Sequence, residues 1–371
     1  MSIAVPSRAG RSPRGLSLRE SLRKLADAAV TPLEIDDVLD VFHPLRRGAD
    51  LRGRIVEVRP ETADAATLVI KPGRDWAGHV PGQYLRVGVD VDGVRLWRTY
   101  SLTHGPRADR CISITVKGIP GGVVSNHLVR RVKAGQMIHL GQAQGDFVLP
   151  QPIPGKLLLV TAGSGITPVI GMLRNMFSRA VPVTADIVLL HSALSRSEVI
   201  FGDELRAYAA QGRLRLVELH TDVDGMLDVD CPDTGLAAIV PDLAERTTYA
   251  CGPVGLLDAL EKHHTTHDLP LHIERFRAPV MATGEGGTLT FASGVSVEAD
   301  GATPILDAAE GAGVLMPSGC RMGVCFGCVL PLREGAVRDL RNGEITTASP
   351  GDGVIIQTCI SAAAGACHID H

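Results

Sequence analysis

Residues 317–328 read Pro-Ser-Gly-Cys-Arg-Met-Gly-Val-Cys-Phe-Gly-Cys, and this stretch decides the fold expected for the C-terminal part of the chain. It places Cys320, Cys325 and Cys328 in a C-x4-C-x2-C run, and Cys359 follows after thirty intervening residues. Three thiolates from one tight turn and a fourth from a distant strand can converge on one metal centre. The spacing therefore predicts a site with four sulfur ligands.

The spacing is that of a plant-type 2Fe–2S cluster. Gly319, Gly323 and Gly327 alternate with the cysteines, so the backbone can wrap closely and direct N–H groups at the sulfurs. A structural zinc site is the alternative, but it usually uses two C-x2-C hooks and only one is present. A disulfide pair is a weaker alternative, because we find no secretory leader. Because such a cluster carries one electron at a time, the rest of the chain is expected to supply or use that electron.

Composition sets the limits for the remaining chain. Its 371 residues suffice for two or three domains, and no apolar run approaches the ~18 residues of a membrane span. The net charge is −4, but ten acids and only four bases lie from Thr283 onward. This acidic end could dock a partner protein or could be an ordinary solvated surface. Nothing in the sequence resembles a nucleic-acid footprint. Cys111 and Cys231 are expected to be buried thiols, and Cys367 lies in the tail outside the cluster spacing.

The patterning of the chain predicts a sequence of distinct domains. Residues 1–50 form an N-terminal extension, in which 16–30 has the three- and four-residue apolar spacing of an amphipathic helix. That helix could contact a membrane surface or, as we favour, pack on the body of the protein. Short alternating runs over 51–152 predict an antiparallel β-barrel. Buried strands alternating with helices over 153–278 predict a parallel α/β sheet. A linker, 279–287, precedes a domain of mixed strands that carries the cysteines, 288–371.

One strand of the predicted barrel ends in Arg98-Thr99-Tyr100-Ser101. Here the chain resembles the ferredoxin–NADP reductase superfamily, whose R-x-Y-S motif holds a flavin. The resemblance implies that Arg98 contacts the flavin phosphates and that Tyr100 and Ser101 lie against the isoalloxazine. A diphosphate needs a fixed cation, and the ring system needs an aromatic wall with a hydroxyl near its redox nitrogen.

A second motif, Lys117-Gly-Ile-Pro-Gly-Gly-Val-Val-Ser125, follows at the distance that the superfamily uses for a turn and helix over the flavin phosphates. Backbone and hydroxyl groups of Gly122, Val124 and Ser125 are expected to donate to those phosphates. The alternative is a hairpin turn with Ser125 as an ordinary helix cap. The same resemblance adds Thr99, Thr115 and Lys117 to the expected flavin contacts.

A third motif, Thr161-Ala-Gly-Ser-Gly-Ile-Thr-Pro168, joins a buried strand to a helix, as in superfamily members that bind a nicotinamide dinucleotide. Gly163 and Gly165 permit the turn and the close approach of the cofactor. The sequence therefore predicts that the following residues contact the nucleotide: Thr161, Gly163, Gly165, Thr167 and Pro168.

The nucleotide half of the superfamily ends in a cysteine–glycine pair, seen here as Cys251-Gly252-Pro253. The resemblance places Cys251 near the carbon that donates hydride, whereas a plain buried thiol is the alternative. Glu274 and Phe276 match the closing strand of that half, where an aromatic side chain approaches the flavin. Ser101, Cys251 and Glu274 are thus the expected catalytic residues.

Ser195 and Arg196 follow the second strand of the predicted α/β domain, and residues at this place bear on the choice of nucleotide. Acidic residues there disfavour the 2′-phosphate of NADPH, whereas hydroxyl and basic residues favour it. Ser195 and Arg196 therefore favour NADPH over NADH.

The resemblance covers residues 51–368 and implies a barrel for FAD, an α/β domain for NAD(P)H and a β-grasp ferredoxin domain of α+β class. FMN is the alternative flavin, and FAD is expected because it is usual where the ferredoxin domain is C-terminal. The implied activity is an NAD(P)H:acceptor oxidoreductase of the cytoplasm, and peripheral association with the inner membrane is the alternative location. A membrane fatty acyl-CoA desaturase or alkane-type hydroxylase is the first expected acceptor. A soluble ring-hydroxylating oxygenase, a cytochrome P450 or a hybrid-cluster protein stays open, as does a redox-sensing module without turnover.

Overall fold

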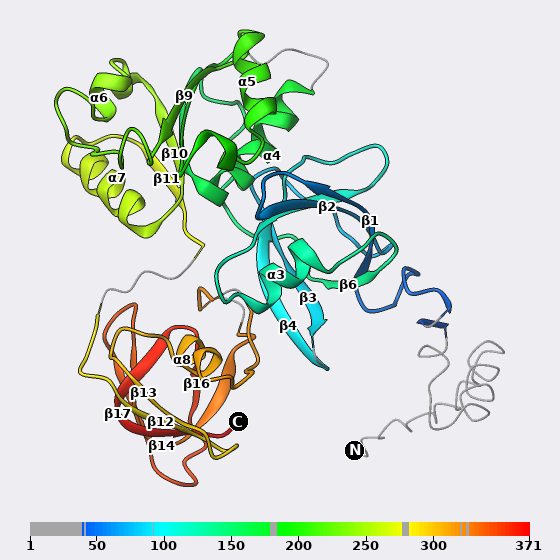
Figure 1. The fold of residues 1–371 in the computed structure, drawn as a ribbon, viewed down its shortest axis with the longest axis vertical. Helices are drawn as coiled ribbons and strands as arrows, with labels where there is room; N and C mark the ends of the chain where they lie inside the picture. The colour runs from blue at the N-terminus through cyan, green and yellow to red at the C-terminus, as the bar shows by residue number, and fades with distance from the viewer. Residues whose placement is uncertain are drawn as a thin grey trace, which may run out of the picture.

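A computed structural model describes residues 39–40, 42–91, 93–178, 184–276, 282–319, 321–323 and 326–371. The helix expected at residues 16–30 lies outside these ranges. Figure 1 shows three bodies along the chain: a barrel, an α/β domain, and a C-terminal domain whose last strand is red. The expected fold class is confirmed for all three. Within the described residues, no helix is long and apolar enough to cross a membrane.

The first body is a six-stranded sheet in the order β4-β3-β6-β1-β2-β5, and its strands pair antiparallel throughout the described residues. An isolated bridge between Leu102 and Ile114 joins the two outer strands, so the sheet closes on itself. Alternate side chains point inward and form an apolar core. Its elements are β1 (Arg52–Pro60), β2 (Ala65–Pro72), β3 (Tyr84–Val91), β4 (Val94–Ser101), β5 (Ile112–Lys117), α3 (Val123–Arg130) and β6 (Met137–Leu140).

The second body is a five-stranded parallel sheet in the order β11-β10-β7-β8-β9. Both faces of the sheet are covered, since separate apolar clusters lie on its two sides. Its strands are β7 (Lys156–Ala162), β8 (Asp186–Ala193), β9 (Arg215–His220), β10 (Thr247–Cys251) and β11 (Leu271–Glu274). Its helices are η1 (Gly163–Gly165), α4 (Ile166–Phe177), η2 (Arg196–Glu198), α5 (Gly202–Ala210), α6 (Leu236–Ile239), η3 (Leu243–Glu245) and α7 (Val254–Thr266).

The third body is a mixed sheet in the order β13-β12-β17-β14-β15, with β16 paired to β14. β12 and β17 run parallel and their neighbours antiparallel, and α8 packs on the sheet to enclose an apolar core. Its elements are β12 (Gly287–Phe291), β13 (Ser296–Ala299), α8 (Ile305–Gly311), β14 (Val329–Asp339), β15 (Ile345–Ala348), β16 (Ile355–Gln357) and β17 (Ser361–Ile369).

Three cysteines outside the cluster spacing have distinct surroundings. Cys111 is buried, as expected. Cys231 is only half-buried, so its expected burial is wrong; the surface turn that holds it lets the Thr234 hydroxyl donate to its sulfur at 3.2 Å. Cys367 does not belong to a loose tail, because β17 carries it into the core of the third body, where burial raises the pKa of its thiol to about 11.

Candidate flavin, nucleotide and cluster sites

Two adjoining hollows lie where the barrel meets the other two bodies. The smaller hollow, about 120 Å³, has walls from all three bodies. It is lined by Tyr100 of β4, Thr167 of α4 and Met322 of the segment 317–328, which we call the cysteine loop. The larger, about 390 Å³, lies between the barrel and α8. Both hollows share Thr99, Tyr100, Lys117 and Phe276, so they form one continuous cleft. The expected flavin contacts all line it: Arg98, Thr99, Tyr100, Ser101, Thr115, Lys117, Gly122, Val124, Ser125 and Phe276.

The larger hollow is built to receive an anion at the start of α3. Gly121 has a φ of +71°, and a Cβ at Gly122 would lie 2.4 Å from Ser125 Oγ, so glycine is favoured at both positions of this turn. Ser125 Oγ accepts the Ile119 N–H at 3.3 Å, which fixes the approach to the helix. A helix N-terminus offers unpaired N–H groups and a partial positive charge to phosphate. The residues present therefore fit the phosphates of a flavin nucleotide.

Arg98 spans the larger hollow and contacts the C-terminal body. Its guanidinium donates to Ser318 Oγ at 2.6 Å and to Glu310 Oε1 at 2.9 Å. Arg321, in the cysteine loop, pairs with the same Glu310 and with Asp307, each at 2.5 Å. Two arginines and two carboxylates thus close the hollow on the side of α8. Arg98, expected to bind flavin phosphate, also holds the C-terminal body against the barrel.

The three expected catalytic residues lie at neighbouring strand ends. Ser101 and Glu274 are buried and line the smaller hollow. Cys251 is paired with Glu274 in parallel register, is fully buried, and does not line that hollow. Burial, with the Glu274 carboxylate beside it, raises the pKa of the Cys251 thiol well above its usual value. Burial, with Asp146 nearby, raises the pKa of Glu274 to about 7. The thiol is therefore neutral, and the carboxyl group can exchange a proton near neutral pH.

The third motif forms the tight turn between β7 and α4. A Cβ at Gly165 would lie 2.0 Å from the Cys251 carbonyl oxygen, so this turn lies directly against the end of β10. Gly163 has a φ of +52° and faces open space. Thr161 is buried and bonded to His191 Nδ1 at 2.8 Å, whereas Thr167 reaches the smaller hollow.

The other residues predicted to contact the nucleotide lie around the same edge of the parallel sheet. Pro168 is buried inside α4, while Gly252 and Pro253 form the turn from β10 into α7. Ser195 and Arg196 line a separate hollow of about 880 Å³ with His220. Across 39–371 as described, no ion pair involves the Arg196 guanidinium.

The structure describes two of the four predicted cluster ligands. Cys328 and Cys359 are buried with their sulfurs 3.1 Å apart, well beyond the ~2.05 Å of a disulfide bond. Cys320 and Cys325 lie outside the described residues. Around them the loop is tightly wound, because Arg321, Gly323 and Phe326 all have positive φ, at 58°, 74° and 54°. Positive φ is uncommon for residues other than glycine, so the surroundings must enforce it. Cys328, at the end of this loop, and Cys359, between β16 and β17, bring two thiols together, which fits a 2Fe–2S cluster.

Several lining residues were not predicted from the sequence. Tyr84 and Ser164 line the smaller hollow, and Asp307 and Glu310 line the larger. Ser164 stands inside the third motif, which could have identified it, whereas Tyr84, Asp307 and Glu310 belong to no motif. Arg321 and Met322 could have been identified from the sequence, because they stand between Cys320 and Cys325. Residues at that place would lie between the cluster and the flavin.

Comparisons with known proteins agree with this geometry. The chain matches the oxidoreductase FAD-binding domain over residues 55–149, the oxidoreductase NAD-binding domain over 159–262 and the 2Fe–2S iron–sulfur cluster binding domain over 291–364. It is 48% identical to an NADPH oxidoreductase of Mycobacterium tuberculosis, over 94% of this chain and 92% of that protein. It is 30% identical to the ferredoxin reductase component of a 3-ketosteroid-9-alpha-monooxygenase of Mycolicibacterium smegmatis, over 82% and 92% of the two chains. Phthalate dioxygenase reductase has a similar fold, with a TM-score of 0.56 and 23% identity over 86% of this chain and 98% of that one.

These findings define a flavoprotein iron–sulfur reductase in which three cofactor domains follow one another on one chain. The chain belongs to the ferredoxin–NADP reductase superfamily, in the group with a C-terminal 2Fe–2S domain. It is an NAD(P)H-dependent oxidoreductase that binds FAD and a 2Fe–2S cluster.

Proposed function

We propose that this protein passes electrons from NADPH, through FAD and the 2Fe–2S cluster, to an oxygenase-type acceptor protein. The observation that carries the proposal is the smaller hollow, whose walls come from the barrel, from the α4 turn and from the cysteine loop. A bound FAD accepts two electrons as hydride and returns them singly, which suits a nicotinamide donor and a one-electron cluster. One cleft touched by all three domains would allow both transfers without a large domain movement.

The expected catalytic residues, the flavin-phosphate contacts and the cluster ligands each have a role in this proposal. Ser101 and Glu274 line the hollow where the nicotinamide and flavin rings would meet, and Glu274 would hold or release a proton there. The neutral Cys251 thiol would lie behind this wall, beside Glu274 on the neighbouring strand. Arg98 and the N-terminus of α3 would hold the flavin phosphates. Four thiolates, from Cys320, Cys325, Cys328 and Cys359, would hold the cluster.

NADPH is the proposed donor because Ser195 and Arg196 line the hollow beside β8, where a 2′-phosphate would lie. The mycobacterial relative at 48% identity is itself named an NADPH oxidoreductase. Steady-state rates with each nucleotide test this assignment. A kcat/KM for NADPH above that for NADH is expected, and a preference of about tenfold for NADH would refute it.

The proposed acceptor is a membrane fatty acyl-CoA desaturase or an alkane-type hydroxylase. Relatives named as reductase subunits of a glycine betaine monooxygenase and a 3-ketosteroid-9-alpha-monooxygenase favour a second candidate, a soluble oxygenase component. Reconstitution with NADPH and each class of acceptor separates the two by product formation. Cys328→Ser is expected to abolish transfer to either acceptor and to leave ferricyanide reduction intact. Negligible turnover with every acceptor and dye would instead indicate a redox-sensing protein.

A further inference from the structure

A separate basic cavity lies at the other end of the barrel from the flavin cleft. It measures about 410 Å³ and is bounded by the end of β2, the loop after it, and the loop that leads into β5. β5 contributes Ile112 to this cavity and Lys117, at its opposite end, to the flavin cleft. Thr115, three residues from Ile112, also lines the flavin cleft, so at ~3.4 Å per residue roughly 10 Å of strand separates the two sites. The two sites share no lining residue, so this cavity is no part of the flavin site.

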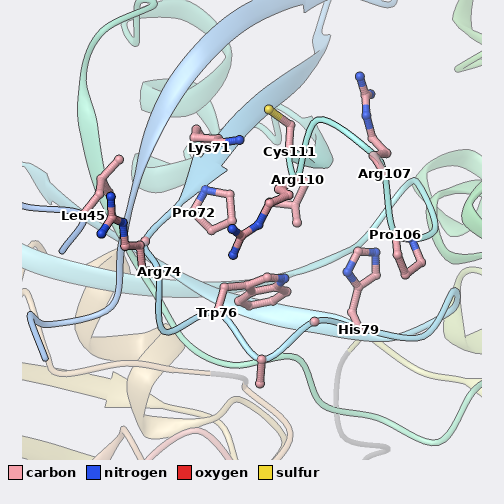
Figure 2. Close-up of a pocket in the computed structure, with 14 residues that line it drawn as sticks. Leu45, Lys71, Pro72, Arg74, Trp76, His79, Pro106, Arg107, Arg110 and Cys111 are labelled. Carbon is pink, nitrogen blue, oxygen red and sulfur yellow. The ribbon is translucent and has the colours of Figure 1, made fainter. Parts of the chain in front are cut away.

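Cations surround an apolar floor in this cavity. Figure 2 shows Arg110 between Pro72 and Trp76 in the centre of the cavity, with Lys71 and Arg74 on its walls. Arg110 has a φ of +59°, an uncommon conformation for a residue with a side chain, and closes a turn by donating its N–H to the Arg107 carbonyl oxygen at 3.0 Å. The turn thus fixes the direction in which Arg110 leaves the backbone.

The positive charge here is only partly neutralised. Arg107 points away from the cavity in Figure 2 and is paired with Asp109 at 2.6 Å. Among residues that the structure describes, no ion pair involves the guanidinium groups of Arg74 or Arg110. The segments 39–54, 71–80 and 104–112 carry eight arginines and lysines and four acids, a net charge of +4 in a chain whose total is −4. The attraction for anions is therefore local to this face.

Exposed apolar side chains adjoin the cations. A second hollow, about 280 Å³, shares Leu45 and Arg74 with the cavity and is lined by Phe42, whose exposed fraction is 73%. Val80, next to the cavity residue His79, is 49% exposed. Isolated exposed apolar residues are common, but a large aromatic side chain beside an unpaired cationic cavity combines the two chemistries of a membrane interface.

We propose that this face of the barrel binds the surface of an anionic membrane, with a phospholipid phosphate held in the cavity by Lys71, Arg74 and Arg110. Phe42 and Val80 would enter the headgroup boundary beside it. An acidic protein partner would complement the charge and could bury Phe42 as well. A membrane is preferred because a cavity of about 410 Å³ lined by Lys71, Arg74 and Arg110 suits a single phosphate group. The inference stands apart from the proposed electron transfer, because none of these residues lines the flavin or nucleotide sites.

Vesicle sedimentation of the full-length protein with flavin and cluster bound tests the proposal. Binding to phosphatidylcholine vesicles with about 30% phosphatidylglycerol should exceed binding to pure phosphatidylcholine at least tenfold at about 0.1 M salt. Arg74→Gln with Arg110→Gln should weaken binding roughly thirtyfold, since each cation near an anionic surface contributes a factor of about five. Adding Phe42→Ser to this double variant should weaken vesicle binding further.

The matched control is Lys262→Gln with Arg333→Gln, which removes the same charge from exposed positions on other domains and should change binding less than about twofold. Unchanged ferricyanide reduction shows that each variant is folded. Equal binding by the native protein and the Arg74/Arg110 variant would overturn the proposal. So would calorimetric binding of inorganic phosphate without vesicle binding, which would assign the cavity to a free anion. The proposal would also be overturned if the native protein did not bind vesicles and the Arg74/Arg110 variant transferred electrons to an acceptor protein more slowly. That result would assign this face to a protein partner.

Discussion

Replacement of Glu310 by Gln should tighten flavin binding, although Glu310 lies in the cluster domain. Glu310 pairs with Arg98 at 2.9 Å across the larger hollow, and Arg98 is the cation proposed for the flavin phosphates. A diphosphate must therefore share Arg98 with a carboxylate that also repels it. The neutral amide removes the competition and the repulsion together, so the affinity for flavin should rise.

The size of the effect follows from the burial of the pair. The two side chains are 17% and 22% exposed, so water screens them only in part. Two unit charges about 4 Å apart interact by ~4 kcal/mol at an effective dielectric constant of about 20. Desolvation and residual solvent access reduce the net contribution to about 1–2 kcal/mol. The dissociation constant of the flavin should therefore fall about 5- to 30-fold.

Quenching of flavin fluorescence on titration into flavin-free protein measures that constant directly. Glu334→Gln, an exposed charge change in the same domain, is the matched control and should leave it unchanged. In the flavin-free protein, Glu310→Gln should also speed amide exchange in α8, because the ion pair between Arg98 of the barrel and Glu310 of α8 is lost. A weaker affinity for flavin in Glu310→Gln would refute the reasoning, since it would mean that Glu310 orients Arg98 for the flavin.

Three further predictions concern the nucleotide side of the cleft. Cys251→Ala should slow flavin reduction by NADPH in stopped-flow absorbance and leave the cluster spectrum unchanged; an unaltered rate would remove Cys251 from the proposed site. Because the pKa of Glu274 is raised to about 7, its contribution to stability is present at low pH and is lost as pH rises through that value. Glu274→Gln should thus be more stable than the native protein at pH 8, by up to about 3 kcal/mol, with a gap that closes toward pH 5 in urea unfolding; a gap independent of pH would contradict this. Gly165→Ala should destabilise strongly because its Cβ would lie 2.0 Å from the Cys251 carbonyl oxygen, whereas Gly163→Ala meets open space and should cost only ~1 kcal/mol for its positive φ; equal losses in thermal unfolding would show that the turn relaxes.

The sequence predicted those features that depend on local patterns. Alternating runs identified the barrel, and the glycine turn between β7 and α4 identified the nucleotide edge, because strand period and turn chemistry are written in neighbouring residues. The flavin contacts from Arg98 to Ser125 line one cleft because short motifs fix their positions on adjacent strands. The helix expected after the third motif is also present, and it begins inside the motif, at Ile166.

Contacts between domains could not be predicted in this way. Arg98 and Glu310 are 212 residues apart, and no spacing rule links a barrel strand to a helix of another domain. The burial of Cys367 depends on the parallel pairing of β12 with β17, a long-range contact that the final residues do not reveal. The basic cavity likewise forms only when the loops before β3 and β5 come together with Leu45.

Anaerobic reduction by NADPH tests the central claim most directly, with flavin absorbance and the paramagnetic resonance of the reduced cluster followed together. In the native protein NADPH should bleach the flavin and then reduce the cluster. In flavin-free protein that retains its cluster, NADPH should leave the cluster oxidised, and added FAD should restore its reduction. Cluster reduction at the same rate without flavin would contradict the proposed order of electron transfer from NADPH through FAD to the cluster.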